Sequence, residues 1–421
     1  MRIADIVEML TEGQPPVRFT AYDGSSFGPD GSPYTLHLAT ERGLSYVATA
    51  PGDLGLARAY VSGDLELQGT HPGDPYEALK ALGQWRLRRP AARDLARFVQ
   101  ELGWKKLVPP PPPPQETMPR WRRTLEGLRH SPHRDAAAIQ RHYDVSNSFY
   151  SKVLGPSMAY TCAVFPKADA SLEEAQEEKF DLVARKLDLQ PGQRLLDVGC
   201  GWGGMVRHAA KHYGVQAVGV TLSAQQAHWA QQMVEREGLS GQVQVLHDDY
   251  RHAPGEHYDA VSSIGLLEHV GVANYPAYFS FLFGKLRDEG RLLNHCITRP
   301  DNKSNPLPGG FIDRYVFPDG ELTGSGRIIS AAQDAGFEVR HEENLREHYA
   351  LTLEQWCANL VRNWDTCVAD VGIGTAKVWG LYMAGSRLGF ETNGVQLHQV
   401  LAVKPTPSGS AGFPLRPTWL T

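Results

Sequence analysis

Between residues 190 and 405, short apolar runs alternate with longer segments whose apolar residues recur at helical spacing. Short runs bounded by turn residues predict buried strands, and the longer segments predict helices. Seven runs read as strands: 193–199, 215–222, 243–250, 258–265, 290–297, 337–344 and 395–404. Alternation on this scale predicts an α/β fold with a doubly wound, mostly parallel seven-stranded sheet, which binds ligands at the carboxyl ends of its strands.

Two further regions precede this alternation. Residues 34–40 and 44–50 read as short strands, and residues 52–67 and 74–89 as helix-rich, so we expect a small N-terminal α/β domain. The segment "SLEEAQEEKFDLVARKLDL" (171–189) has a Ser/Glu capping pattern before an amphipathic run, which predicts a helix.

Six consecutive prolines, Pro109 to Pro114, separate the two regions. Such a run cannot join a helix or a sheet and is typical of a stiff spacer. We therefore predict a domain at 1–107, a linker at 108–119 and a second domain at 120–421, of which 120–190 is a helical lead-in.

Composition is that of a globular protein, with 42% hydrophobic and 21% charged residues. Its five cysteines are scattered without metal-ligand spacing, which predicts a reducing cytoplasm with no disulfide framework and no metal site. We see no signal peptide and no run long enough to span a membrane.

The net charge of −5 is unevenly spread, because residues 80–141 hold fourteen Lys and Arg against five Asp and Glu. Trp85, Trp104 and Trp121 lie among these arginines. Indoles beside cations suit an anionic membrane surface, and a solvated arginine-rich surface is an equally weighted alternative. No recognition motif accompanies the charge, so we expect no nucleic acid partner.

A glycine-rich loop follows the first predicted strand, in "LLDVGCGWGG". The loop has the glycine spacing of nucleotide-binding sites, at Gly199, Gly201 and Gly204. Such glycines let the backbone come close to a nucleotide bound at the start of the following helix. A dinucleotide site would have a carboxylate near the end of the second strand, where this chain has Thr221. Asp197 before the loop instead favours S-adenosylmethionine, with Asp249 and Tyr250 after the third strand as partners for the adenosine.

Eight segments carry a family resemblance: "HYDVSNSFY", "YTCAVF", "LLDVGCGWGG", "GVTLSAQQ", "GLLEHVG", "LLNHCI", "YVFPDG" and "HYALTLEQW". The same segments occur in the same order in cyclopropane-fatty-acyl-phospholipid synthases and mycolic acid cyclopropane synthases. The chain therefore resembles these enzymes over about residues 140–402. The C-terminal segment 380–404 and "NHCITRPDN" are most similar to the actinobacterial branch that makes 10-methylene and 10-methyl stearoyl lipids (tuberculostearic acid).

The resemblance implies a class I methyltransferase-type fold with a helical lid. It implies an enzyme that transfers the methyl group of S-adenosylmethionine to the double bond of an unsaturated acyl chain in a phospholipid, with a bound bicarbonate as base. We favour a 10-methylene product over a cyclopropane. Leu267 and Cys296 stand where other branches often have an aromatic residue and a threonine, which leaves the product open.

Carried onto this sequence, the resemblance assigns two sets of residues. The bicarbonate cage would be Glu268, His295 and Tyr349 through side chains, with the backbone near Cys162 and Ile297. The cofactor site would comprise Tyr143, Tyr160, Thr161, Asp197, Gly199, Gly201, Thr221, Gln226, Asp249 and Tyr250. His269, beside Glu268, we interpret as structural.

Other interpretations stay open at this point. The chain could be a lipid-binding protein with an inert methyltransferase domain, or a methyltransferase for a soluble small molecule. We expect a homo-oligomer that binds the inner face of the membrane peripherally from the cytoplasm, and a reductase partner if a methyl branch is completed.

Overall fold

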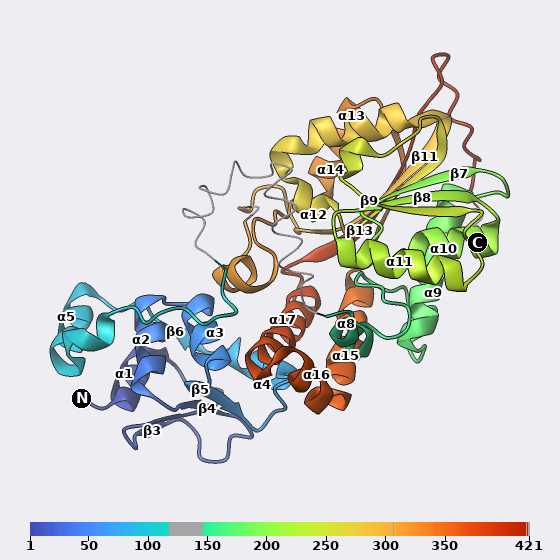
Figure 1. The fold of residues 1–421 in the computed structure, drawn as a ribbon. Helices are drawn as coiled ribbons and strands as arrows, with labels where there is room; N and C mark the ends of the chain where they lie inside the picture. Colours follow the sequence, from blue (N-terminus) through green and yellow to red (C-terminus); the bar gives the residue numbers. More distant parts are fainter. Residues whose placement is uncertain (118–145, 306, 418, 420–421) are drawn as a thin grey trace. The chain divides into compact units, whose positions relative to one another are not determined.

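The computed structural model describes residues 1–117, 146–305, 307–417 and 419, and it divides into two compact units (Figure 1). Unit 1 comprises Met1–Pro119, Gly309–Pro318 and Trp356–Leu388, and unit 2 comprises Arg120–Pro308, Asp319–Gln355 and Gly389–Thr421.

Unit 2 contains the predicted seven-stranded sheet, in the order β12-β13-β11-β10-β7-β8-β9. The five strands from β11 to β9 pair in parallel, whereas β13 is antiparallel to both β11 and β12. The strands are β7 (Arg194–Val198), β8 (Gln216–Thr221), β9 (Val243–His247), β10 (Tyr258–Ile264), β11 (Leu286–Thr298), β12 (Glu338–Asn344) and β13 (Gln396–Val403). Each predicted strand is therefore present.

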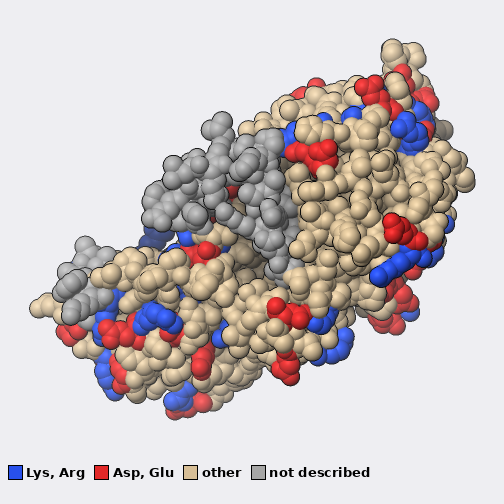
Figure 2. Space-filling view, viewed as in Figure 1, with Lys and Arg blue, Asp and Glu red and all other residues tan. Residues whose placement is uncertain are grey.

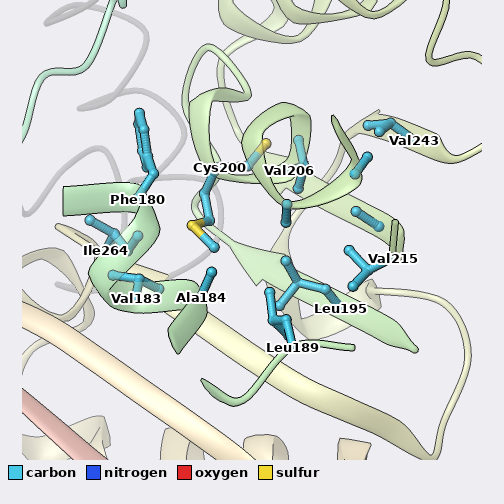
Figure 3. Close-up of a cluster of buried hydrophobic side chains, with 14 of the residues drawn as sticks. Phe180, Val183, Ala184, Leu189, Leu195, Cys200, Val206, Val215, Val243 and Ile264 are labelled. Carbon is cyan, nitrogen blue, oxygen red and sulfur yellow. The ribbon is translucent and has the colours of Figure 1, made fainter. Parts of the chain in front are cut away.

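Helices cover both faces of this sheet. They are α9 (Leu172–Leu187), α10 (Gly204–Tyr213) and α11 (Ala224–Arg236) on one face, and α12 (Leu267–Val270), α13 (Tyr275–Lys285) and α14 (Ser325–Asp334) on the other. Unit 2 also contains α8 (Asn147–Leu154). Successive side chains of a strand point to opposite faces, so each strand contributes to two apolar cores. On β11, Leu293 belongs to the core under α9, α10 and α11, and Leu292 belongs to the core under α12, α13 and α14. Figure 3 shows part of the first core, where Val183 and Ala184 of α9 lie near Leu195 of β7.

Unit 1 is built on a four-stranded mixed sheet, in the order β3-β2-β4-β5, with a separate β1–β6 pair. Its strands are β1 (Thr11–Glu12), β2 (Arg18–Ala21), β3 (Ser26–Phe27), β4 (Thr35–Leu38), β5 (Leu65–Gln68) and β6 (Arg86–Leu87). Its N-terminal helices are α1 (Ile3–Leu10), α2 (Glu41–Thr49), α3 (Asp53–Val61), α4 (Tyr76–Leu82) and α5 (Ala92–Leu102). Later in the chain come the last turns of α15 (Arg346–Arg362), then α16 (Trp364–Val371) and most of α17 (Ile373–Glu391).

One of the predicted N-terminal strands is wrong, because residues 44–50 lie almost entirely in helix α2. Thr40 caps this helix by accepting a hydrogen bond from the Gly43 N–H at 3.1 Å. The apolar residues Leu44 and Val47 then share one face and pack against the core of unit 1. A capped start and a three-residue apolar spacing outweigh the β-propensity of a short run.

A buried ion cluster fixes the end of the proline-rich segment. The Glu116 side chain is fully buried, and Arg58 donates to both its oxygens at 2.6 and 2.7 Å. Arg314 makes a second ion pair with Glu116, and the Tyr315 hydroxyl donates to it at 3.2 Å. The carbonyl of Pro111 also accepts from the Tyr46 hydroxyl at 2.6 Å. Of the predicted stiff linker 108–119, the described residues up to 117 are thus tied to unit 1 at Pro111 and Glu116.

The same contacts draw two later segments into unit 1, which the predicted boundary at 120 does not anticipate. Residues 309–318 are held by Arg314 and by the Phe311 N–H, which donates to Asp53 at 3.1 Å. In the segment Trp356–Leu388, Trp364 lies edge-on to His71 with ring centroids 5.1 Å apart. These pairings are long-range, so no local composition change marks them.

The described part of the basic region does not form a single basic patch on the face drawn in Figure 2, where unit 1 carries Lys and Arg interspersed with Asp and Glu. The Trp85 indole packs against the unit 1 core and donates to the Thr11 hydroxyl at 3.1 Å. Trp121 lies outside the described residues. In the part of the chain that the structure describes, no helix is sufficiently long and apolar to cross a membrane.

Candidate active site

A pocket opens at the carboxyl ends of β7 and β8, around the glycine loop. Gly199, with φ of +76°, makes the turn that leaves β7. Gly204 begins α10 so close to α9 that an added Cβ would lie 2.5 Å from the Phe180 ring. Both positions therefore require glycine for a geometric reason. The predicted cofactor residues that line this pocket are Tyr160, Thr161, Asp197, Gly199, Gly201, Thr221, Gln226 and Tyr250.

Two predicted cofactor residues are not in this set. Tyr143 lies outside the described residues. Asp249 is committed to Arg251, whose guanidinium donates to both its carboxylate oxygens at 2.7 and 2.6 Å. Burial alone would raise the pKa of Asp249, but the hydrogen bonds and charge of Arg251 hold that pKa below its usual value. The neighbouring Asp248 lines the pocket instead.

Thr221 and Gln226 act as a pair at the end of β8. The Thr221 hydroxyl donates to the Gln226 Oε1 at 2.9 Å, and both side chains are buried. This hydrogen bond fixes the Gln226 amide, so its Nε2 group is the end left to face a ligand. Thr221 therefore orients Gln226.

Lys179, which we did not predict, lines the same pocket from helix α9. It is 1% exposed and donates to the Thr161 hydroxyl at 2.9 Å. Burial lowers the pKa of Lys179 to about 7, and burial raises the pKa of Asp197 to about 7, although Ser262 donates to Asp197 at 2.6 Å. The sequence does indicate that Lys179 is unusual, because it lies on the apolar face of an amphipathic helix, beside Phe180 and Val183. His269, which we interpreted as structural, also lines the pocket.

Glu268 lies just past β10, at the start of the short helix α12, and is 9% exposed. Its Oε1 accepts from the Ile297 N–H of β11 at 2.7 Å. Burial raises the pKa of Glu268 to about 7, while the Ile297 hydrogen bond opposes that rise. Two residues predicted for the bicarbonate cage, Glu268 and Ile297, are thus in direct contact, and the Ile297 N–H is used by the Glu268 carboxylate.

His295 lies two residues before Ile297 on the same strand and is 1% exposed. Its Nδ1 lies 3.2 Å from the Gln399 Nε2. Burial lowers the pKa of His295 well below its usual value, and Lys179 and Lys186 add to that effect. The side chain is therefore neutral.

Cys162 and Tyr349 meet at the carbonyl of Leu345, which lies just before α15. The Cys162 Sγ donates to this carbonyl at 3.8 Å, and the Tyr349 N–H donates to it at 3.2 Å. Burial raises the pKa of the Cys162 thiol, so it is not a thiolate nucleophile. Lys179 acts electrostatically on both Cys162 and His295, so these two of the predicted cage residues lie within range of the same buried lysine.

Two buried atoms of this neighbourhood have no hydrogen-bond partner within the described residues: Glu268 Oε2 and His295 Nε2. Unpaired buried polar atoms are costly and call for an explanation. Glu268 is held by the Ile297 N–H, and His295 lies two residues before Ile297 on β11, beside the last residue of β10. Both therefore lie near the carboxyl ends of β10 and β11, although neither lines the glycine-loop pocket itself.

Sequence comparison matches the mycolic acid cyclopropane synthetase family over residues 130–400. The chain belongs to this family. It is 62% identical to a probable fatty acid methyltransferase of Mycobacterium tuberculosis, over 100% of this chain and 98% of that one. It is 35% identical to the cyclopropane-fatty-acyl-phospholipid synthase of Escherichia coli K12, over 64% of this chain and 68% of that one.

Among solved structures, the chain resembles a mycolic acid cyclopropane synthase complexed with SAH and CTAB. The TM-score is 0.61 at 35% identity, over 65% of this chain and 99% of that one. The predicted fold and the predicted class, an S-adenosylmethionine-dependent enzyme that acts on fatty acyl chains, are confirmed.

Proposed function

We propose that this enzyme transfers the methyl group of S-adenosylmethionine to the double bond of an unsaturated acyl chain in a phospholipid and yields a 10-methylene acyl chain. The observation that carries the proposal is the pair of partnerless buried atoms, Glu268 Oε2 and His295 Nε2, at the sheet edge that holds the glycine-loop pocket. The names of the fatty acid methyltransferase and phospholipid synthase relatives support the acyl substrate.

The residues present fit a bound bicarbonate. A carboxylate oxygen accepts hydrogen bonds, and a neutral imidazole can donate one, so together they match a small anion that carries one O–H group. When bound, bicarbonate would supply the base for the proton that the acyl chain loses. Glu268 would hold the O–H end, and the Ile297 N–H keeps the carboxylate in place. Tyr349 would add a donor from α15.

Methyl transfer to an alkene leaves a carbocation on the acyl chain, and the residues here would control its fate. A hydride shift followed by loss of a proton from the new methyl group gives the methylene product. Direct loss of that proton with ring closure gives a cyclopropane, the alternative product. Glu268, with its pKa near 7, accepts the proton at neutral pH and relays it outward. Because the side chains around this site are buried, water is excluded and cannot add to the carbocation.

Leu267 and Cys296 are the residues we propose to decide between these products. Both are 1% exposed and lie in the core under α12, α13 and α14. The charge of Glu268 acts on the Cys296 thiol, whose pKa burial raises well above its usual value. A small thiol and an aliphatic side chain leave the proton-accepting group in a less polar environment than a threonine and an aromatic residue would.

We propose that the acyl chain is presented at the inner membrane face, with the enzyme peripheral, cytoplasmic and oligomeric. The basic composition of residues 80–141 supports attraction to anionic phospholipid. Completion of a methyl branch from a methylene product requires a hydride donor, so a reductase would act next in that case.

The test is incubation of the full-length enzyme with S-adenosylmethionine and oleoyl phospholipid vesicles, followed by mass spectrometry and proton NMR of the released fatty acids. A gain of one CH2 with vinylidene protons is expected, and upfield ring protons would instead establish the cyclopropane. No mass gain, with retained binding to the vesicles, would favour a non-catalytic lipid-binding protein. Turnover of a water-soluble acceptor alone would favour a small-molecule methyltransferase.

A further inference from the structure

A line of buried hydrogen bonds leads from helix α9 to His295. The Lys186 ammonium donates to the Gln399 Oε1 at 2.7 Å, and the Gln399 Nε2 lies 3.2 Å from the His295 Nδ1. Lys186 and Gln399 are 0% exposed and His295 is 1% exposed. Gln399 and His295 are direct cross-strand partners on β13 and β11, so backbone pairing fixes their spacing.

The chemistry of these three groups determines where the imidazole proton lies. An ammonium group can only donate, so the Gln399 oxygen faces Lys186 and its NH2 group faces His295. The His295 Nδ1 must then accept. A neutral imidazole has one N–H, so the proton is on Nε2, the atom without a partner among the described residues.

Charge around the ring supports the same state. Among the described residues, Lys179 and Lys186 of α9 act electrostatically on His295, and together with burial both oppose its protonation. Glu343 on β12 forms an ion pair with Lys186 and keeps that side chain at Gln399. The lysines lie seven residues apart, on the face of α9 that packs against the sheet.

We propose that Gln399, oriented by Lys186, is a positioning residue that holds His295 as a neutral Nε2–H donor to a small oxyanion. The identity of the oxyanion as bicarbonate rests on the proposed function, whereas the tautomer does not. A ring fixed in this way cannot take up the proton that the reaction releases, because Nδ1 is occupied by Gln399 and Nε2 already bears hydrogen. The proton outlet is therefore Glu268.

The wild-type enzyme tests the tautomer directly. The full-length protein is labelled with 15N-histidine, and the His295 signals are assigned by their loss in His295→Gln. We expect a protonated Nε2 and an unprotonated Nδ1 across neutral pH. A protonated Nδ1, or a doubly protonated ring, would overturn the proposal without reference to any activity.

A near-isosteric variant tests the role of Gln399. In Gln399→Glu both side-chain oxygens accept, so the proton moves to Nδ1 or the ring becomes charged. The matched control is Gln396→Glu, on the same strand, where Gln396 contacts Asn393 at 2.7 Å instead. We expect the 15N signature to change in Gln399→Glu only.

Kinetic measurements distinguish the role of Gln399 in fixing the tautomer from the role of His295 as a donor to the oxyanion. If Gln399→Glu moves the single proton to Nδ1, the concentration of added bicarbonate that gives half-maximal rate should rise about tenfold or more, because the Nε2–H hydrogen bond to a charged group is lost, with little change in the KM for S-adenosylmethionine. A doubly protonated ring keeps its Nε2–H, so it should show no such rise, and it would establish that Gln399 keeps the ring neutral. An altered tautomer with an unchanged bicarbonate requirement would refute the role of His295 as an oxyanion donor. An unaltered tautomer in Gln399→Glu would refute the role of Gln399.

Discussion

Unit 1 and unit 2 each bury a glutamate, and they treat it in opposite ways. Glu116 in unit 1 is fully buried and is paired with Arg58, Arg314 and the Tyr315 hydroxyl. Glu268 in unit 2 has one oxygen on the Ile297 N–H and the other without a partner within the described residues. A buried charge that is fully paired holds structure together, whereas a buried charge that is left incompletely paired is available for chemistry.

The largest effect is expected from Glu268→Gln. The amide keeps the hydrogen bond from Ile297 but cannot accept a proton, so turnover should fall about 10²- to 10⁴-fold, the usual contribution of acid–base catalysis. Stability at pH 8 should be unchanged or higher, because the buried carboxylate is ionised there. Initial rates and urea unfolding of both proteins measure this, and largely intact turnover would refute the proton-accepting role.

Glu116→Gln should show the reverse behaviour. It leaves Arg58 and Arg314 buried against a neutral partner, which should lower the free energy of unfolding of unit 1 by about 3–5 kcal/mol. The rate per folded molecule should change far less than in Glu268→Gln. Urea unfolding monitored together with activity distinguishes the two glutamates. A stable Glu116→Gln protein would show that the ion cluster is dispensable.

The pH dependence of the turnover rate is a further way to compare Glu268 with Glu116. Since burial raises the pKa of Glu268 to about 7, its ionised form is lost as pH falls through 7, and the rate should fall with it. Among the described residues, the titratable groups near it include His269 on the same helix and Tyr275, Tyr278, Cys296 and Glu321 on other segments. Asp197 and Lys179 also titrate near 7, so kcat is measured at saturating S-adenosylmethionine. The residual rate of Glu268→Gln should lack the acidic limb, and an identical limb would assign it to another group.

The smallest effect concerns the two adjacent acids of "HDDY". Asp248 lines the pocket, so Asp248→Asn should weaken S-adenosylmethionine binding about 3- to 10-fold, the worth of one hydrogen bond. Asp249→Asn should instead lower stability, because it releases Arg251. Calorimetric titration with the cofactor compares the variants, and a larger loss of affinity in Asp249→Asn would reverse the assignment.

The sequence predicts the sheet and the glycine loop well because both depend on local patterns. All strands of this sheet except the largely polar β12 follow apolar runs, and Gly199 and Gly204 follow a backbone requirement. Asp248 and Asp249 are adjacent, so a shift of one residue decides which carboxylate faces the ligand. The sequence alone does not show which of the two lines the pocket.

Long-range contacts explain the other differences. Residues 309–318 belong to unit 1 through distant partners: Arg314 reaches Glu116, almost 200 positions away, and the Phe311 N–H donates to Asp53. The Glu-rich helix α9 places Lys179 beside apolar residues in the sequence, but only the packed sheet shows that Lys179 and Lys186 are both buried. The sequence does not predict helix α2, because Thr40, which caps the helix, also fits the end of the strand predicted at 34–40.

The most direct test of the central claim is whether the partnerless atoms of Glu268 and His295 bind a small oxyanion. 13C-labelled bicarbonate is titrated into the full-length wild-type enzyme and into Glu268→Gln and Glu116→Gln, and the bound fraction is followed by 13C NMR. We predict saturable binding in the wild type and in Glu116→Gln, and weak or no binding in Glu268→Gln. Equal binding by all three proteins, or full wild-type turnover in bicarbonate-free buffer without any bound signal, would contradict the account.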